Sequence, residues 1–119
     1  SAQLKNTAGK FVAPNVKSIS AAADIELPAD TRSMITNSSA PEAYPISCFT
    51  WILLYKEQDY NKRSLAQAES TVKLVSWMLG AEAQKLPSQV NYAPLPASVI
   101  ANAKELLKTI TYKGQVLLK

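Results

Sequence analysis

The sequence offers one strong nucleophile, the thiol of Cys48, and no histidine to activate it. A reactive cysteine needs a helix start or a nearby cation that favours the thiolate, and the sequence gives no sign of either. Cys48 lies in an apolar stretch beside Phe49, so we expect a small buried apolar residue. Without histidine, neither a histidine zinc cluster nor a Ser–His pair can form. We therefore expect no catalytic residue, no metal site, no cofactor and no enzymatic activity.

Three carboxylates lie close together in the sequence, and such groups can act as acid and base or hold a hard cation. They are Asp24, Glu26 and Asp30. Their spacing matches no calcium loop, and residues 27–28, Leu-Pro, interrupt the run. We therefore expect solvated loop acids.

Two further features are of the kind found in ligand sites. Trp51 and Trp77 could line a cleft, but their expected places on a strand and at the edge of a helix stripe favour packing against each other or nearby core. An anion cradle needs several clustered backbone amides, whereas Gly9, Gly80 and Gly114 are far apart in the sequence. The sequence therefore contains no glycine-rich phosphate loop.

The composition is that of one globular unit. The chain has 119 residues, 47% of them hydrophobic, and its longest apolar run, residues 51–55, is much shorter than the roughly 20 residues of a membrane span. The net charge is +4, but the lysines are scattered and residues 62–63 form the only dense basic pair, so we expect no nucleic-acid surface. The sequence opens at Ser1 without a charged and apolar leader, so we expect any targeting segment to lie upstream.

The first 45 residues predict short elements between prolines. Phe11–Val12 should form a brief strand. Asn15 should cap a short helix through residues 21–23, because its side-chain oxygen can accept the free amide hydrogens at the helix start. Residues 33–36 should form a second short strand.

Residues 46–56 are rich in β-branched and aromatic side chains and are apolar on both faces near their end. This pattern is typical of a strand in the middle of a sheet, covered by helices on both sides. A first amphipathic helix is predicted over residues 65–79, and residues 81–86 could extend it until Pro87 ends it.

A second amphipathic helix is predicted near the carboxyl end. Residues 91–96 should be extended because a proline disfavours helix in the residue before it. The helix should start near Pro96 and carry its apolar stripe to Ile110, and Gly114 should close it. Residues 116–118 are expected to form a terminal strand.

These elements predict an incomplete sheet. A strand buried on both faces needs hydrogen-bonded neighbours, yet residues 46–119 supply at most one other candidate, at 116–118. Residues 1–45, another chain or a segment upstream could fill the sheet. Because open edges and apolar faces seek partners, we expect the chain to self-associate or to pair with a missing amino-terminal part.

Four stretches together resemble the carboxyl-terminal part of the PstS family, the substrate-binding proteins of the bacterial phosphate ABC transporter. They are NTAGKFVAP at 6–14, AYPISCFTWILLYK at 43–56, LVSWML at 74–79 and YAPLP at 92–96. Their order matches, and the resemblance extends over nearly the whole chain. Tyr-Pro-Ile-Ser before an apolar strand, combined with Tyr-Ala-Pro-Leu-Pro before a terminal helix, is the specific part of the resemblance.

The resemblance implies an α/β architecture: a partial type II periplasmic-binding-protein fold, the carboxyl-terminal portion of a two-lobed receptor. Residues 1–44 would finish the second lobe with short strands and a short helix. Residues 45–119 would contain the hinge crossing and the carboxyl-terminal part of the first lobe, with a central strand and two or three helices. The hinge residues would be Tyr44, Pro45, Ile46 and Ser47.

The resemblance also implies inorganic phosphate as the ligand of a full-length parent and an ABC transporter permease as its partner. The family's phosphate ligands, an Arg, an Asp and a Ser-Gly-Thr turn, would lie upstream, and residues 38–40 are not that turn. No binding residue is therefore expected in this segment. The implied location is the periplasm or, with a lipid anchor, the outer face of the cytoplasmic membrane. Two alternatives remain open, a receptor for another oxyanion and a stand-alone protein-interaction module on the same scaffold.

Overall fold

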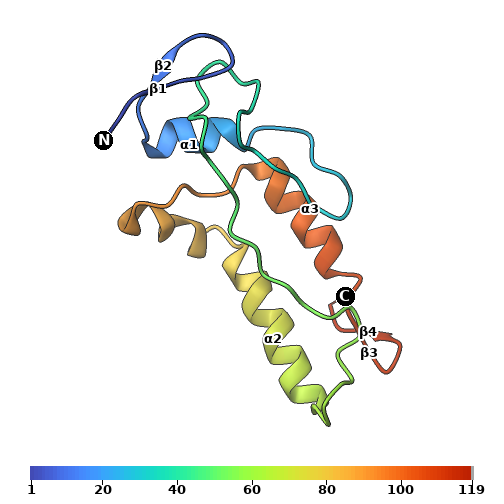
Figure 1. The fold of residues 1–119 in the computed structure, drawn as a ribbon. Coiled ribbons are helices and arrows are strands. Elements are labelled where there is room, and N and C mark those ends of the chain that lie inside the picture. Colours follow the sequence, from blue (N-terminus) through green and yellow to red (C-terminus); the bar gives the residue numbers. More distant parts are fainter. Residues whose placement is uncertain (119) are drawn as a thin grey trace.

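The computed structural model describes residues 1–118. Figure 1 shows a hairpin and a short helix at one end and two longer helices with a second hairpin in the rest. The mixture of helices and short strands is compatible with the expected α/β class. The elements in chain order are β1 (Leu4–Lys5), β2 (Phe11–Val12), α1 (Val16–Ala22), α2 (Leu65–Met78), the 3-10 helices η1 (Ala83–Lys85) and η2 (Pro87–Val90), α3 (Ala97–Leu107), β3 (Thr111–Tyr112) and β4 (Gln115–Val116).

The amino-terminal end consists of an antiparallel hairpin followed by α1. Leu4 in β1 lies opposite Val12 in β2, which confirms the strand expected at residues 11–12. The expected cap of α1 is also confirmed. The Asn15 side chain accepts the Ser18 N–H at 2.9 Å, and the Ser18 hydroxyl accepts the Asn15 N–H at 3.1 Å. Two of the free donors at the helix start are thereby satisfied.

A small apolar core lies beside α1. Ala22, Ala23, Ile35 and Ala43 are buried in it, and partly buried side chains such as Phe49 pack against it. The strand predicted at residues 33–36 was wrong, because no backbone ladder forms there. Ile35 is buried because its side chain packs in this core, and residues 33–36 make isolated hydrogen bonds in place of a strand ladder.

A second core lies between α2 and α3. The Ser64 hydroxyl accepts the Gln67 N–H at 3.3 Å, so α2 begins where its sequence predicts. Val72 from α2, Leu107 from α3 and Ile110 just beyond α3 are the buried residues of this core. The helix stripe thus positions its apolar residues largely as expected.

Both helices are shorter than predicted. The chain turns after Met78, where the Gly80 N–H donates to the Trp77 carbonyl at 2.8 Å. The extension through residues 81–86 was wrong, since η1 is a separate turn. Pro87 does not end a helix either, because it is the first residue of η2 and its missing N–H costs nothing at that position.

The carboxyl end forms a hairpin where the last turn of a helix was expected. Since α3 ends at Leu107, Ile110 is buried outside the helix. Strands β3 and β4 are antiparallel, with Tyr112 opposite Gln115. Gly114, at φ +75°, turns the hairpin rather than closing the helix. The expected terminal strand exists, but its strand residues are Gln115–Val116.

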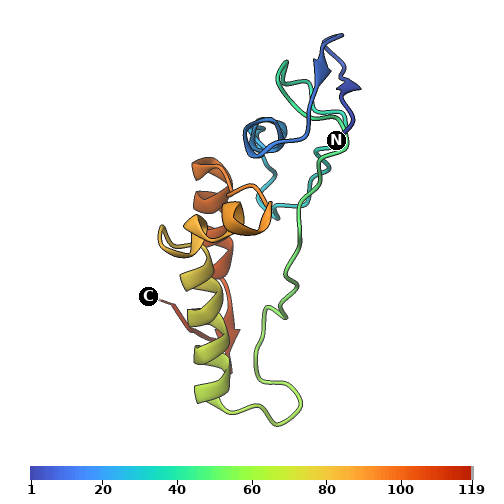
Figure 2. The ribbon, with the colours of Figure 1, turned by 90° about the vertical axis from the view of Figure 1, so that its left-hand side faces the viewer.

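The buried central strand predicted at residues 46–56 was wrong. The segment is extended but belongs to no ladder, and Figure 2 shows it running alone past the helices. Leu53 is 90% exposed, and Trp51, Ile52 and Tyr55 are also exposed, whereas Leu54 packs on the second core. The residue pattern belongs to a strand covered on both sides, but the described residues supply no neighbouring strand for it.

The molecule is therefore extended for its length. Its radius of gyration is 16.8 Å, whereas a compact domain of this length has about 13.5 Å. Its accessible surface is 8046 Å², whereas a folded monomer of 12.9 kDa exposes about 6,300 Å². About 1,700 Å² of surface is exposed beyond that norm.

Candidate functional site

The expected hinge residues form a tight turn between the first core and the extended segment. The Tyr44 N–H donates to the Ser18 carbonyl at 3.0 Å, which fixes the start of the turn to α1. The Ser47 hydroxyl donates to the Tyr44 carbonyl at 2.8 Å and closes the turn. Tyr44, Pro45 and Ser47 are buried, whereas Ile46 is exposed.

Two contacts from the preceding loop hold the far side of the same turn. The Asn37 N–H donates to the Pro45 carbonyl at 2.8 Å, and the Thr36 hydroxyl donates to the Ser47 carbonyl at 3.3 Å. The turn is thus attached on two sides to the amino-terminal part. The first residues without such attachments are those that follow Ser47.

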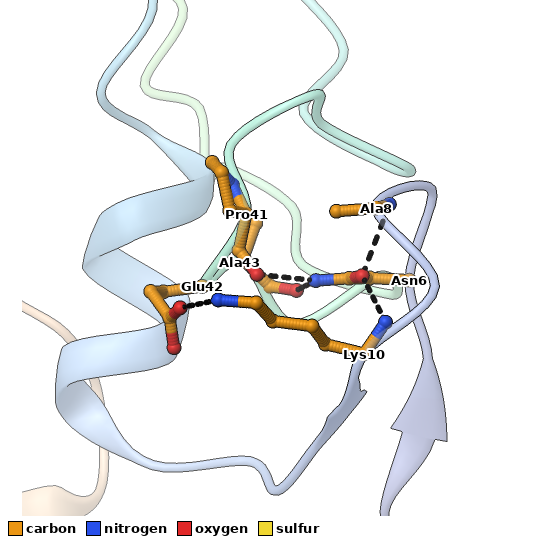
Figure 3. Close-up of polar contacts among 6 residues, drawn as sticks. All are labelled: Asn6, Ala8, Lys10, Pro41, Glu42 and Ala43. Atoms are coloured by element: carbon orange, nitrogen blue, oxygen red, sulfur yellow. Dashed lines mark hydrogen bonds and ion pairs between the residues drawn. The ribbon is translucent and has the colours of Figure 1, made fainter.

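A buried asparagine connects the first hairpin to residues 41–43, a segment that we call the strap and that leads into the turn at residues 44–47. Asn6 donates through its side-chain amide to the carbonyls of Pro41 at 2.9 Å and Ala43 at 3.2 Å. Its side-chain oxygen accepts the N–H groups of Ala8 and Lys10, each at 3.1 Å (Figure 3). One side chain that is only 6% exposed therefore satisfies four backbone groups from two distant segments.

An ion pair lies beside this network. The Lys10 ammonium contacts the Glu42 carboxylate, as Figure 3 shows. The hydrogen bond and charge of Lys10, with a smaller effect of Lys17, lower the pKa of Glu42. Both partners are more than half exposed, so the pair contributes little to stability. The buried Asn6 is the stronger link between the hairpin and the strap.

At its far end the extended segment is attached to the β3–β4 hairpin through Glu57. The carboxylate accepts N–H groups from Asp59 at 3.0 Å, Lys113 at 2.9 Å and Gly114 at 3.1 Å, and the Thr111 hydroxyl at 3.0 Å. The backbone hydrogen bonds from Asp59 and then Gly114 are the main causes that lower the pKa of Glu57 to about 2.

This carboxylate predicts a pH dependence of stability. The pKa of Glu57 is lower in the folded chain than its ordinary value of 4.5, so its stabilisation is present above pH 4.5 and is lost as the pH falls towards 2. In Glu57→Gln, we expect the free energy of unfolding measured by urea to fall less between about pH 5 and about pH 3 than in the unchanged chain. Glu105→Gln removes an exposed carboxylate whose hydrogen bond comes from Lys108, and it should keep the full dependence. Equal pH profiles for the Glu57→Gln variant and the unchanged chain would contradict the assignment.

The side chain of Gln58, the residue after Glu57, is fully buried and binds Arg63, which lies just before α2. The Gln58 side-chain oxygen accepts from the Arg63 guanidinium at 2.6 Å, and its amide donates to the Tyr55 carbonyl at 2.6 Å. The Arg63 guanidinium also donates to the Tyr60 hydroxyl, the Gln67 carbonyl and the Thr71 hydroxyl. Arg63 therefore directs its terminal N–H groups to protein oxygens.

The residues with candidate chemistry do not come together. Cys48 is exposed, so the expectation of a buried residue was wrong, since the segment that carries it has no covering layer. Asp24, Glu26 and Asp30 are exposed loop residues, as expected. Asp30 accepts from the Arg32 side chain at 2.8 Å, and this hydrogen bond is the main cause that lowers the pKa of Asp30.

Among the described residues, the tryptophans do not pair with each other, and neither lines the hollow at Arg63 or the hollow at Lys10 and Glu42. Trp51 meets Phe49 edge to face at 5.4 Å between ring centres, and Trp77 is 55% exposed on α2. The expectation that both pack in or near core is therefore right only in part. Both indoles remain accessible to a covering surface.

A surface hollow along α2 does not form an anion site. It measures about 410 Å³ and is lined by Arg63, Gln67, Ser70 and Thr71, among others. Arg63 is the only cationic side chain in its lining, and the guanidinium is held by Gln58 and its other protein partners. Burying a phosphate requires charge-assisted donors that replace its water. Within residues 1–118, acidic and sulfur side chains also form no group suited to a metal ion.

Sequence reasoning missed the residues that make the strongest polar links, Asn6, Glu57 and Gln58. The Asn-Thr-Ala-Gly run at residues 6–9 does signal a turn, but the contacts of Asn6 to residues 41 and 43 are not visible in local sequence.

No helix in the described part of the chain is long and apolar enough to cross a membrane.

Comparisons with known proteins identify the relatives of the chain. Curated proteins named phosphate-binding protein match it, and all three described below carry the name PstS. Two, from two strains of Xylella fastidiosa, are 31% identical over 100 residues, which are 82% of this chain and 26% of each relative. A third, from Haemophilus influenzae, is 28% identical over 109 residues, which are 89% of this chain and 31% of the relative. No protein-family model matches the chain.

The resemblance to the PstS family is thereby confirmed. The match extends over most of this chain, and the chain spans between a quarter and a third of the length of these relatives. Such coverage is that expected of a carboxyl-terminal part of a longer protein.

Proposed function

We propose that the chain is the carboxyl-terminal portion of a phosphate-binding receptor that serves an ABC-type importer and is not an enzyme. In this proposal, phosphate is held between two lobes, and its ligands lie outside these residues. Residues 1–44 end the second lobe, and residues 45–119 complete the first lobe in a type II periplasmic-binding-protein fold. The similarity to proteins named for phosphate binding, over 82–89% of this chain, carries the proposal.

The hydrogen bonding of the turn formed by Tyr44, Pro45, Ile46 and Ser47 supports a hinge at the carboxyl end of this turn. The turn is fixed to the amino-terminal part through Ser18 and Asn37, and the next attached residues are near Glu57. A rigid turn followed by a segment without backbone hydrogen bonds concentrates rotation at their junction. In the proposed receptor, the lobes close about this junction, and the closed form docks on a membrane permease from the periplasm or from a lipid anchor.

The partners of the two arginine side chains support the proposal that the phosphate-binding residues lie outside this chain. The terminal nitrogens of Arg63 donate to protein oxygens, and Arg32 is an exposed residue paired with Asp30. Both arginine side chains are therefore already paired with oxygens of the protein.

Phosphate titration of a chimera tests the proposal. The chimera is the Xylella fastidiosa relative in which its 100 matched residues are replaced by the matching residues of this chain. We expect the chimera to bind phosphate saturably in isothermal titration calorimetry, whereas the 119-residue chain alone should not, because it lacks the donors.

The control is the unchanged Xylella protein, with sulfate as a second anion. A folded chimera that binds neither anion would refute the receptor assignment, and one that binds sulfate in preference to phosphate would favour another oxyanion. Saturable phosphate binding by the 119-residue chain alone would show that the ligand groups are not outside it.

A further inference from the structure

A single hydrogen bond connects the two parts of the chain that the extended segment joins. Residues 1–47 hold the buried residues of the first core, and residues 55–118 hold those of the second. The Ser20 hydroxyl on α1 donates to the Pro94 carbonyl at 3.4 Å, just before α3 (Figure 1). Among the described residues, no other hydrogen bond and no ion pair connects these two parts.

The donor of this bond is fixed to the first part of the chain. Ser20 lies on α1 between the capping residue Asn15 and the fully buried Ala22, which packs in the first core. The helix is anchored at both of these points. Ser20 therefore moves together with residues 1–47.

The acceptor is fixed to the second part of the chain. The Leu95 N–H donates to the Gln84 side-chain oxygen at 2.8 Å, and the Gln84 amide donates to the Met78 carbonyl at the end of α2, also at 2.8 Å. Pro94 and Pro96 have restricted φ angles, which stiffens the backbone on either side of Leu95. The Pro94 carbonyl therefore moves together with α2.

The length of the bond suits a restraint that can open. O–H···O hydrogen bonds are usually about 2.5–3.0 Å long, so a contact at 3.4 Å is weak. A weak bond favours one orientation of the two parts by a small factor and does not lock it. Because the donor and the acceptor lie on opposite sides of the junction after Ser47, rotation at this junction changes the distance between them.

We propose that the Ser20–Pro94 hydrogen bond is a latch that holds the two parts of the chain in the orientation of this structure, and that rotation at the junction after Ser47 opens it. The latch adds a named restraint to the proposed hinge and rests on the proposed function for its part in lobe closure. Its test measures the orientation of the two parts in this chain without phosphate. The latch can therefore fail while the receptor assignment stands, and the reverse.

Pulsed electron paramagnetic resonance tests the latch as a distance between two spin labels. The labels are attached to cysteines at exposed positions in the two parts, Ser39→Cys and Lys73→Cys, in a Cys48→Ser background. In Ser20→Ala, we expect the ratio of molecules outside the main distance peak to those inside it to rise by roughly two- to fivefold. Alanine is a strong helix former, so α1 should persist. An unchanged distance distribution would overturn the proposal.

Two further variants separate the latch from a general effect of substitution. Ser98→Ala is the matched control, because it makes the same change on α3 at a side chain that makes no hydrogen bond among the described residues. It should leave the ratio unchanged. Gln84→Ala removes the group that positions the acceptor and should raise the ratio as Ser20→Ala does.

Circular dichroism verifies that all three variants keep their helices. Equal ratios in Ser20→Ala and Ser98→Ala would show that the bond does not set the orientation. Equal ratios in Gln84→Ala and Ser98→Ala would contradict the positioning of the Pro94 carbonyl through Gln84.

Discussion

Leu107→Ala is expected to lower the free energy of unfolding of the helical part by about 2–5 kcal/mol. Leu107 is 5% exposed and shares the core between α2 and α3 with Val72 and Ile110. Removal of its side chain loses buried apolar area and leaves a cavity. This core has three buried residues, so little neighbouring mass can move in to fill the space.

Urea unfolding followed by the circular dichroism of the helices measures this effect. Leu106→Ala is the matched control, because it makes the same chemical change one residue earlier at a side chain that is 40% exposed. The control should change the free energy of unfolding by less than about 1 kcal/mol. Equal losses in the two variants would mean that Leu107 does not occupy the core described here.

Asn6→Ala is expected to cost about 2–4 kcal/mol in the amino-terminal part. The change removes four hydrogen bonds and leaves the carbonyl of the fully buried Ala43 without a donor, while the more exposed Pro41 carbonyl can bind water. Unpaired buried polar groups carry the larger part of this cost. The strap should then separate from the β1–β2 hairpin.

Hydrogen exchange at the Tyr44 amide measures the loss, because that amide donates to Ser18 in α1 at the end of the strap. Asn6→Asp is a second variant that keeps the two acceptor contacts but loses both donors, so it should also be destabilised. Asn102→Ala, in α3, makes the same substitution at a side chain that makes no hydrogen bond among the described residues. Unchanged exchange at Tyr44 in Asn6→Ala would contradict the role of Asn6.

Local sequence signals predicted the elements whose stability is local. The cap of α1 at Asn15 and the start of α2 after Ser64 depend on side chains within three residues of the helix start, and α3 starts after Pro96 without a side-chain cap. The stripe of α2 likewise requires helical spacing alone. These features appear in the structure as the sequence indicates.

The incorrect predictions concern contacts between parts of the chain that are far apart in the sequence. Residues 46–56 have the composition of a buried strand, but burial requires neighbours, and the described residues do not provide them. The same missing layer explains why Cys48 is exposed. The contacts of Asn6 span 35 and 37 residues, so no local pattern indicates them.

The bare segment between the two cores also sets how the molecule loses its structure. The core beside α1 and the core between α2 and α3 share no residue, and residues 48–54 between them carry no hydrogen bond. Cooperativity requires contacts whose loss in one region removes support from another. The two ends should therefore melt as separate units, and damage at Asn6 and at Leu107 should combine additively.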